Sequence, residues 1–191
     1  MKIIIVDNGS RHLTALANIC KLYGQVSIIP LSQINQIVDS PNTILILSGG
    51  HSKSVVGHKK LYANEIKLIK NTKMPIIGVC LGFELIALTY HNSLTPRTQR
   101  LHRLVKITPT LNGAVFDKVG PMIVFQSHKW MVKTTADPLL EIARSKSEVE
   151  IFKHKSKPIY GLQFHPEVHI GRNNGDRLFN NIIGILKNSI L

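Results

Sequence analysis

Residues 75–90, PIIGVCLGFELIALTY, carry the strongest structural signal in the chain. The apolar run over residues 75–79 predicts a buried strand, and the pattern over residues 83–90 predicts a helix. Between them, two glycines flank Cys80 in a Gly-x-Cys-x-Gly motif. Such a motif between a strand and a helix is typical of a nucleophile elbow, here with cysteine in place of serine, because the glycines permit a tight turn and close helix–strand packing.

An elbow would give Cys80 the properties of a nucleophile. It would lift the thiol to the carboxyl end of the strand, where open α/β sheets place their functional sites. The N-terminus of the following helix favours the thiolate, and the turn leaves the backbone N–H of Leu81 free to bind an oxyanion. A small core cysteine in a tight turn would give the same five letters, so the motif needs support from elsewhere in the chain.

The chain on either side of this stretch predicts the rest of an α/β fold. On the N-terminal side, β-branched apolar runs alternate with helical periodicity, which indicates a parallel sheet covered on both faces. On the C-terminal side, strand-like runs separated by turn residues indicate an antiparallel or mixed edge. Strands are expected at residues 2–6, 25–29, 43–47, 75–79, 104–108, 122–125, 139–143, 149–152 and 159–164, and helices at residues 13–23, 61–69, 83–90 and 178–186.

Length and composition fit one globular domain, residues 1–191, with 43% hydrophobic and 18% charged residues. We expect an open, mostly parallel, flavodoxin-like α/β sheet with helices on both faces and a small antiparallel β excursion in the second half. No apolar run approaches the ~18 residues of a membrane span, and the N-terminal MKIIIVDNGS does not resemble a signal peptide. We therefore expect a cytoplasmic protein in which Cys20 and Cys80 are reduced.

The charge balance is strongly basic. Lys and Arg total 24 against 11 Asp and Glu, which gives a formal net charge of +13. Such a balance can indicate nucleic acid, an anionic substrate or an acidic partner. The basic residues are spread along the chain without an RNA- or DNA-binding motif, so solvated surface is the simplest interpretation and nucleic acid is not expected. Docking of an acidic partner is predicted for the most concentrated group, which is Arg97, Arg100, Arg103 and Lys106.

A second motif, QFHPE at residues 163–167, follows the last expected strand. Residues two apart in an extended segment project to the same side, and Pro166 keeps His165 out of the helical region. The His165 imidazole and the Glu167 carboxylate can therefore meet, and the carboxylate can fix the tautomer of the ring. With Cys80 they would form a triad of nucleophile, base and orienting acid. A surface histidine beside a solvated acid is the alternative for this motif alone.

Together, GVCLG at residues 78–82, FHPEV at residues 164–168 and LSGG at residues 47–50 resemble the class I, or triad, glutamine amidotransferases. The resemblance covers essentially the whole chain, and the family has the open α/β fold expected above. It implies that glutamine is hydrolysed through a glutamyl thioester and that ammonia passes to a synthetase absent from this chain. It implies no metal or cofactor here, since ATP and Mg²⁺ would belong to the synthetase.

The resemblance also implies a role for each matching position. Cys80 would attack the carboxamide of glutamine, and His165, oriented by Glu167, would protonate the departing ammonia and then activate water. Gly50 and Leu81 would supply the N–H groups of the oxyanion hole. The positions implied in glutamine binding are Gly49, Gly50, Leu81, Glu84, Ser127, His128 and Lys129.

Within the family, the chain resembles in particular the separate amidotransferase subunits of GMP synthetases. The matching segments are VDNG at residues 6–9, SGG at residues 48–50, Ser127-His128, and YGLQFHPEV at residues 160–168. This resemblance implies an ATP-dependent synthetase partner that makes GMP from XMP.

Glu84 departs from the family pattern, which usually has glutamine at this position. A carboxylate there would repel the α-carboxylate of glutamine, unless Glu84 is protonated or turned toward the substrate ammonium. On the plain interpretation, Glu84 weakens glutamine binding and Glu84→Gln improves it. The departure leaves two alternatives open: a degenerate amidotransferase with a binding or regulatory role, and a free-standing hydrolase of γ-glutamyl compounds that uses the same triad.

Overall fold

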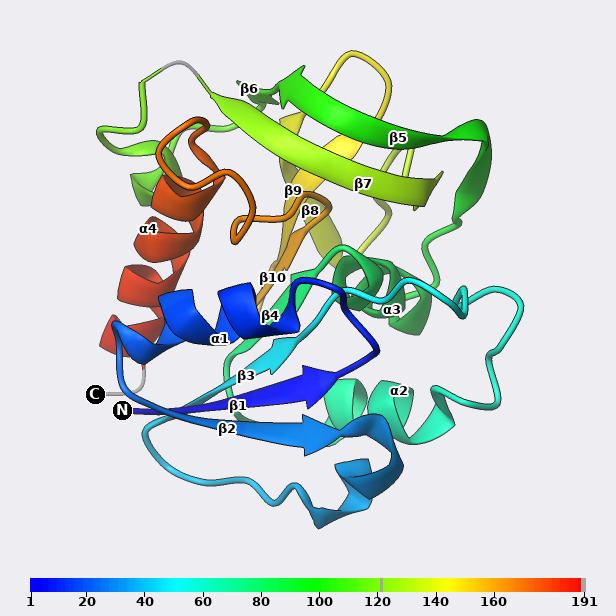
Figure 1. Cartoon of the computed structure of the whole chain (residues 1–191), viewed down its shortest axis with the longest axis vertical. Coiled ribbons are helices and arrows are strands. Elements are labelled where there is room, and N and C mark those ends of the chain that lie inside the picture. Colours follow the sequence, from blue (N-terminus) through cyan, green and yellow to red (C-terminus); the bar gives the residue numbers. More distant parts are fainter. Residues whose placement is uncertain (121, 190–191) are drawn as a thin grey trace.

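Two sheets carry the strands of the computed structural model, which describes residues 1–120 and 122–189 (Figure 1). Residues 121, 190 and 191 of the predicted domain lie outside the described residues. The strands are β1 (Lys2–Asp7), β2 (Gln25–Pro30), β3 (Thr43–Leu47), β4 (Ile76–Val79), β5 (Thr95–Lys106), β6 (Thr108–Pro109), β7 (Ile123–Met131), β8 (Leu139–Arg144), β9 (Val149–His154) and β10 (Ile159–Leu162).

The larger sheet has the order β2-β1-β3-β4-β10-β9-β8-β6. Its first five strands run parallel, and β9, β8 and β6 continue it in antiparallel pairings. The smaller sheet is the antiparallel pair β5–β7. The expected α/β fold, with a mostly parallel sheet and an antiparallel excursion in the second half, is therefore confirmed.

Helices cover both faces of the larger sheet, as the apolar strands require. Strand β3 alternates between them: Ile44 and Ile46 pack toward α1 and α4, whereas Leu45 and Leu47 pack toward α2 and α3. Within the described residues, no helix is long and apolar enough to cross a membrane. The α-helices are α1 (Leu13–Lys21), α2 (Ala63–Asn71), α3 (Leu81–Thr89) and α4 (Gly175–Asn188), and the 3₁₀ helices are η1 (Leu31–Gln36) and η2 (Ala114–Phe116).

The β5–β7 ribbon differs most from the sequence prediction. The expected strand at residues 104–108 is wrong as one element, because β5 extends from Thr95 to Lys106 and residues 108–109 belong to the other sheet. Likewise β7 continues to Met131, well past the expected end at Phe125. Most β5 side chains are exposed, so the strand lacks the apolar alternation that would reveal it; pairing with β7 determines its length. Figure 1 shows this ribbon lying across the carboxyl ends of β4 and β10.

Candidate active site

Cys80 occupies a strained turn between β4 and α3. Its φ angle is +51° and its ψ angle is −98°, a region that non-glycine residues rarely adopt. The Cys80 N–H donates to the carbonyl of Leu162 on β10 at 2.8 Å, and its carbonyl accepts from the N–H of Glu84 at 3.0 Å. The predicted elbow is thus present, with the thiol at the carboxyl end of β4 and the N-terminus of α3.

The glycines of the motif allow the strand and the helix to touch. A Cβ atom on Gly78 would lie 2.5 Å from the carbonyl carbon of Gly82, and a Cβ on Gly82 would overlap the carbonyl oxygen of Leu47. Backbone therefore fills the space that any larger residue would need. This close contact between β4, α3 and β3 supports the strained backbone of Cys80.

The two residues predicted to form the oxyanion hole lie against each other. A Cβ on Gly50 would approach Leu81 Cδ1 to 2.5 Å, and both residues line a cavity with Cys80. Leu81 is the first residue of α3, so its N–H has no acceptor within the helix. The loop before Gly50 is anchored by Ser48, whose Oγ accepts from the N–H of Asn8 at 3.0 Å.

His165 and Glu167 meet as the motif predicts. The His165 Nδ1–H donates to Glu167 Oε1 at 2.8 Å, and both side chains are buried. Burial by itself would lower the pKa of His165, but the negative charges of Cys80 and Glu167 and hydrogen bonds to both raise it to about 10. The His165 N–H donates to the carbonyl of Phe125 on β7 at 2.9 Å, which fixes the histidine loop to the ribbon.

The structure brings the predicted nucleophile, Cys80, and the predicted base, His165, together around Gly49. A Cβ placed on Gly49 would lie 3.0 Å from His165 Cε1 and 3.6 Å from Cys80 Cβ. Since Nδ1 of the ring is engaged by Glu167, Nε2 is the nitrogen available to Cys80. The carbonyl of Ser127 lies 3.9 Å from Cys80 Sγ on the ribbon side. This arrangement can support nucleophilic acyl transfer with a histidine as proton carrier.

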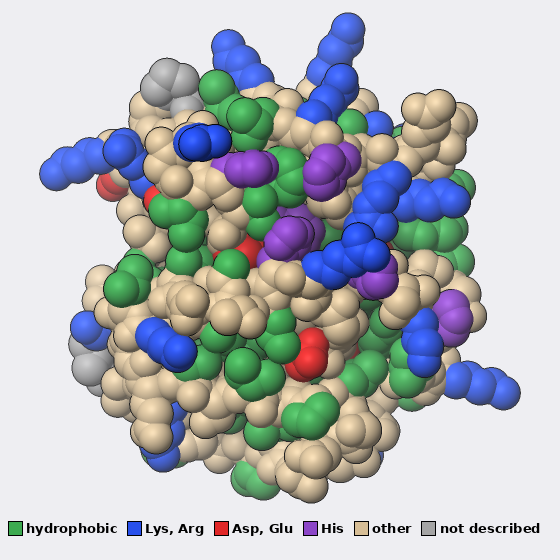
Figure 2. All heavy atoms as spheres, in the orientation of Figure 1, with side chains coloured by type: hydrophobic (Ala, Val, Ile, Leu, Met, Phe, Trp, Pro, Cys, Tyr) green, Lys and Arg blue, Asp and Glu red, His purple; other side chains and the backbone are tan. Residues whose placement is uncertain are grey.

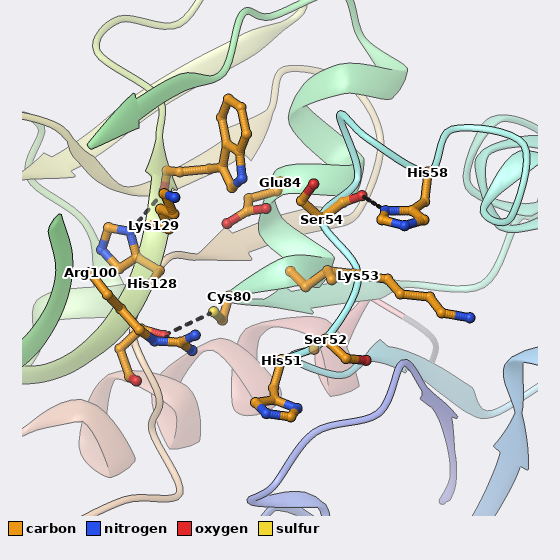
Figure 3. A pocket seen from close by; sticks show the side chains of 14 residues that line it. His51, Ser52, Lys53, Ser54, His58, Cys80, Glu84, Arg100, His128 and Lys129 are labelled. Atoms are coloured by element: carbon orange, nitrogen blue, oxygen red, sulfur yellow. Dashed lines mark hydrogen bonds between the residues drawn. The ribbon is translucent and has the colours of Figure 1, made fainter. Parts of the chain in front are cut away.

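A cavity of about 300 Å³ opens beside Cys80 (Figure 3). Its walls include nearly all of the positions predicted to bind substrate. Gly49 does not line this cavity, and His165 lines a neighbouring one of about 500 Å³ that shares Gly50 and Ser127 with it. The predicted residues at the first cavity are Gly50, Cys80, Leu81, Glu84, Ser127, His128 and Lys129.

Glu84 and His128 are buried groups at this cavity. Burial raises the pKa of Glu84 to about 8, although Gln163 and the charge of Arg100 act in the opposite direction. Burial lowers the pKa of His128 to about 3, so its ring is neutral, and its Nδ1–H donates to the carbonyl of Trp130 at 2.7 Å. The site thus carries an uncharged histidine and a carboxyl group that binding of a cation could ionise.

Arg100, His51 and His12 are among the cavity residues that the sequence analysis did not assign to the site. Arg100 from β5 lines both cavities, and His51 does so from the loop after β3. The ring of His12 packs edge-on against His165, with the centroids 5.2 Å apart. The charge of Arg100 was noticeable in the sequence, but its place at the site depends on pairings between β5 and β7 that no local pattern encodes.

On the face drawn in Figure 2, the basic residues are spread out rather than gathered into one patch. Figure 2 shows Lys and Arg side chains projecting around one face, with several histidines near its centre. Arg97 is not free for docking, because it forms an ion pair with the buried Glu148. Among the described residues, no cluster of three or more His, Cys, Asp or Glu side chains could hold a metal ion.

Comparisons with known proteins find relatives over nearly the whole chain. The family model "Glutamine amidotransferase class-I" matches residues 4–185. A glutamine-hydrolysing GMP synthase subunit of Methanothermobacter thermautotrophicus is 34% identical over 97% of this chain and 98% of its own length. The corresponding protein of Methanobrevibacter smithii is 32% identical over 98% of this chain and 97% of its own.

A solved structure gives the same relationship in three dimensions. The crystal structure of a candidate GMP synthase subunit from Thermoplasma acidophilum superposes with a TM-score of 0.86 at 27% identity. The match covers 99% of this chain and 95% of that one. The matched fold, the family match over nearly all residues and the sequence identity to these relatives show that the chain belongs to the class I glutamine amidotransferases.

Proposed function

We propose that this amidotransferase hydrolyses glutamine to glutamate and ammonia through Cys80, His165 and Glu167, and delivers the ammonia to a separate synthetase that makes GMP from XMP. The observation that carries the catalytic part is the meeting of three elements: the strained Cys80 turn, the Gly50–Leu81 contact and the His165–Glu167 hydrogen bond. The product is supported by relatives that are themselves glutamine-hydrolysing subunits of GMP synthase.

In this mechanism Cys80 attacks the side-chain carboxamide carbon of glutamine. The N–H groups of Gly50 and Leu81 stabilise the negative oxygen of the tetrahedral intermediate. His165 gives a proton to the departing nitrogen, so that ammonia leaves and a glutamyl thioester remains on Cys80. The neutral His165 then takes a proton from water, which attacks the thioester and releases glutamate. Glu167 holds the ring through Nδ1 and stabilises its cation in both steps.

The positions that would hold glutamine surround this reaction centre. The γ-carboxamide would lie over Cys80, and the rest of the amino acid would occupy the cavity of about 300 Å³. That volume is at the lower end of the ~300–1,000 Å³ range of small-molecule sites, which suits one amino acid. The proposed contacts are Gly49, Gly50, Leu81, Glu84, Ser127, His128 and Lys129.

Activation of the acceptor is assigned to the partner. The proposed reaction on this chain needs no metal or cofactor, so ATP and Mg²⁺ would be bound by the synthetase. Residues 1–191 would then act as one amidotransferase domain, and its cytoplasmic location stays a prediction.

The test is an isotope-transfer assay with the chain and the synthetase encoded by the same genome. Glutamine labelled with ¹⁵N in its side-chain amide is incubated with XMP, ATP and Mg²⁺, and glutamate and [¹⁵N]GMP are measured. The proposal is supported if more label appears in GMP than labelled ammonia released into the solution could supply. A rate of glutamate release that is the same with and without the synthetase, with no labelled GMP, indicates a free-standing hydrolase. Absence of glutamate release under every condition, with the complex assembled, indicates a degenerate amidotransferase.

A further inference from the structure

Arg100 places a guanidinium group beside the nucleophile (Figure 3). Its Nη2 donates to the carbonyl oxygen of Ser127 at 3.1 Å, and this same oxygen lies 3.9 Å from Cys80 Sγ. A single carbonyl therefore positions both groups at one edge of the cavity. The guanidinium is planar and has further N–H groups, so it can donate to a ligand in the cavity while it keeps this contact.

Glu84 supplies the opposite charge in the same cavity. Its carboxyl group is buried on α3, and Figure 3 shows it projecting into the space that Cys80 and His128 also border. The charge of Arg100 acts on Glu84 and favours its ionised form. The cavity thus has a permanent cation from the ribbon and a carboxyl group from α3, with the nucleophile at the same opening.

The other cations at the cavity are less suited to hold a ligand in one orientation. Lys53 and Lys129 line it and are exposed, as Arg100 is, but Figure 3 shows the Lys53 ammonium directed away from Cys80. A lysine ammonium is a flexible point charge, whereas an arginine presents a fixed pair of donors that matches a carboxylate. Arg100 also has its guanidinium anchored by Ser127, which reduces the entropy lost on binding.

We propose that Arg100 is a specificity residue that binds the α-carboxylate of glutamine, while Glu84 accepts hydrogen bonds from its α-ammonium. This inference rests on the proposed function. It explains how a carboxyl group at position 84 is compatible with an amino-acid substrate: the arginine compensates for the charge that would otherwise repel the substrate carboxylate. It also removes Arg100 from the group of basic residues expected only to dock a partner.

Calorimetry on a chain that cannot turn over separates this inference from hydrolysis. Binding of L-glutamine and of L-glutaminamide, whose α-carboxylate is replaced by an amide, is measured on Cys80→Ala and on Cys80→Ala with Arg100→Gln. Arg100→Gln should weaken L-glutamine binding by roughly 10- to 100-fold, the value of a charge-assisted hydrogen-bond pair. L-glutaminamide should bind weakly to both proteins and change by less than about threefold, because it lacks the group that Arg100 recognises.

Two further variants complete the test. Arg103→Gln removes the same charge from the same strand at a residue that lines neither cavity, and should leave glutamine binding unchanged. Arg100→Lys should recover part of the affinity, because it restores the charge without the planar donor pair. Thermal unfolding of each variant confirms that the chain is folded.

Several outcomes overturn the inference. Equal losses for L-glutamine and L-glutaminamide would mean that Arg100 only shapes the cavity. Tighter glutamine binding by Arg100→Gln would mean that the guanidinium obstructs the site. An unchanged affinity for L-glutamine would also exclude the role, even if the parent hydrolyses glutamine. Conversely, a parent that binds glutamine through Arg100 but never hydrolyses it would contradict the proposed function and leave this inference standing.

Discussion

The two sides of the active site are built in different ways. One side, the elbow wall, consists of Gly50, Cys80 and Leu81, and it lies at the carboxyl ends of the parallel strands. The other side, the ribbon wall, consists of Arg100, Ser127 and His128 on the antiparallel β5–β7 pair. Backbone packed against backbone determines the elbow wall, whereas side-chain charges and hydrogen bonds across long sequence distances determine the ribbon wall.

This difference separates reaction from recognition. The elbow wall holds the proposed nucleophile and the proposed oxyanion N–H groups, and it leaves no space for an added Cβ at Gly78 or Gly82. The ribbon wall carries an arginine, a neutral buried histidine and backbone carbonyls. These groups can select one amide substrate over another. Substitutions in the elbow wall should therefore affect turnover and folding most strongly. Substitutions of residues that face the ribbon wall across the cavity, such as Glu84, should affect glutamine binding.

The largest expected effect is at the nucleophile. Cys80→Ala should reduce glutamine hydrolysis by at least about 10³-fold, because no other group can form the thioester. Cys20→Ala is the matched control: this thiol is fully buried in α1, and burial raises its pKa to about 12, so its loss should leave hydrolysis essentially intact. Glutamate release by both variants is the measurement, and turnover by Cys80→Ala at the parent rate would refute the elbow as the reactive site.

A second prediction concerns the backbone packing of the elbow wall. A Cβ on Gly82 would overlap the carbonyl oxygen of Leu47, so Gly82→Ala must push α3 away from β3. We expect a loss of about 1–3 kcal/mol in the free energy of unfolding, together with a large loss of activity because Cys80 moves with the helix.

The control for this substitution is Gly184→Ala on α4, where an added Cβ meets no atom within 4 Å. It should raise the free energy of unfolding by about 0.5–1 kcal/mol, because alanine favours the helix. Urea unfolding measures both variants. Equal effects at the two glycines would show that close packing does not support the elbow.

Glu167→Gln should reduce kcat by about 10–100-fold, less than His165→Ala, because the carboxylate orients the ring without exchanging the transferred proton. Removal of its charge should also lower the pKa of His165, which Glu167 helps to raise. The pH dependence of kcat for the parent and the variant measures this shift. An unchanged rate and an unchanged profile would remove Glu167 from the mechanism.

Glu84→Gln tests recognition opposite the ribbon wall. With Arg100 available for the substrate carboxylate, we expect the variant to raise KM for glutamine by about 10-fold, since an amide accepts less strongly from an ammonium than a carboxylate does. The expected change in kcat is small. A lower KM would instead support the simpler expectation that the carboxyl group repels the substrate.

Glu84 should also make the stability of the chain depend on pH. Its pKa is about 8 in the folded chain against 4.5 for an ordinary glutamate, so the folded state keeps a proton that the unfolded state releases. The free energy of unfolding should therefore decrease as pH rises from about 4.5 to about 8, and Glu84→Gln should flatten this decrease. Urea midpoints between these pH values give the slopes. A steeper slope in the variant would contradict the assignment.

The sequence was sufficient for most of the elbow wall because its causes are local. Adjacent residues in GVCLG specify the turn, the start of α3 and the glycines that touch neighbouring backbone. The His165–Glu167 pair was equally accessible, because two residues in an extended segment project to the same side. Strand β5 was not accessible in the same way, since most of its side chains are exposed and only its pairing with β7 determines where it begins and ends.

By itself, then, the sequence determined the α/β class, the Cys80 turn and the His165–Glu167 pair, which we propose as nucleophile, base and orienting acid, because each follows from periodicity or from residues within one motif. Only the tertiary structure decided that Arg100 shares the carbonyl of Ser127 with Cys80, residues that are 27 and 47 positions from that serine. It also decided that Glu84 is buried opposite a cation and that Arg97 is paired with Glu148. The physical reason is that burial and charge pairing depend on contacts between segments that are distant in the sequence. The local sequence pattern contains no signal for such contacts.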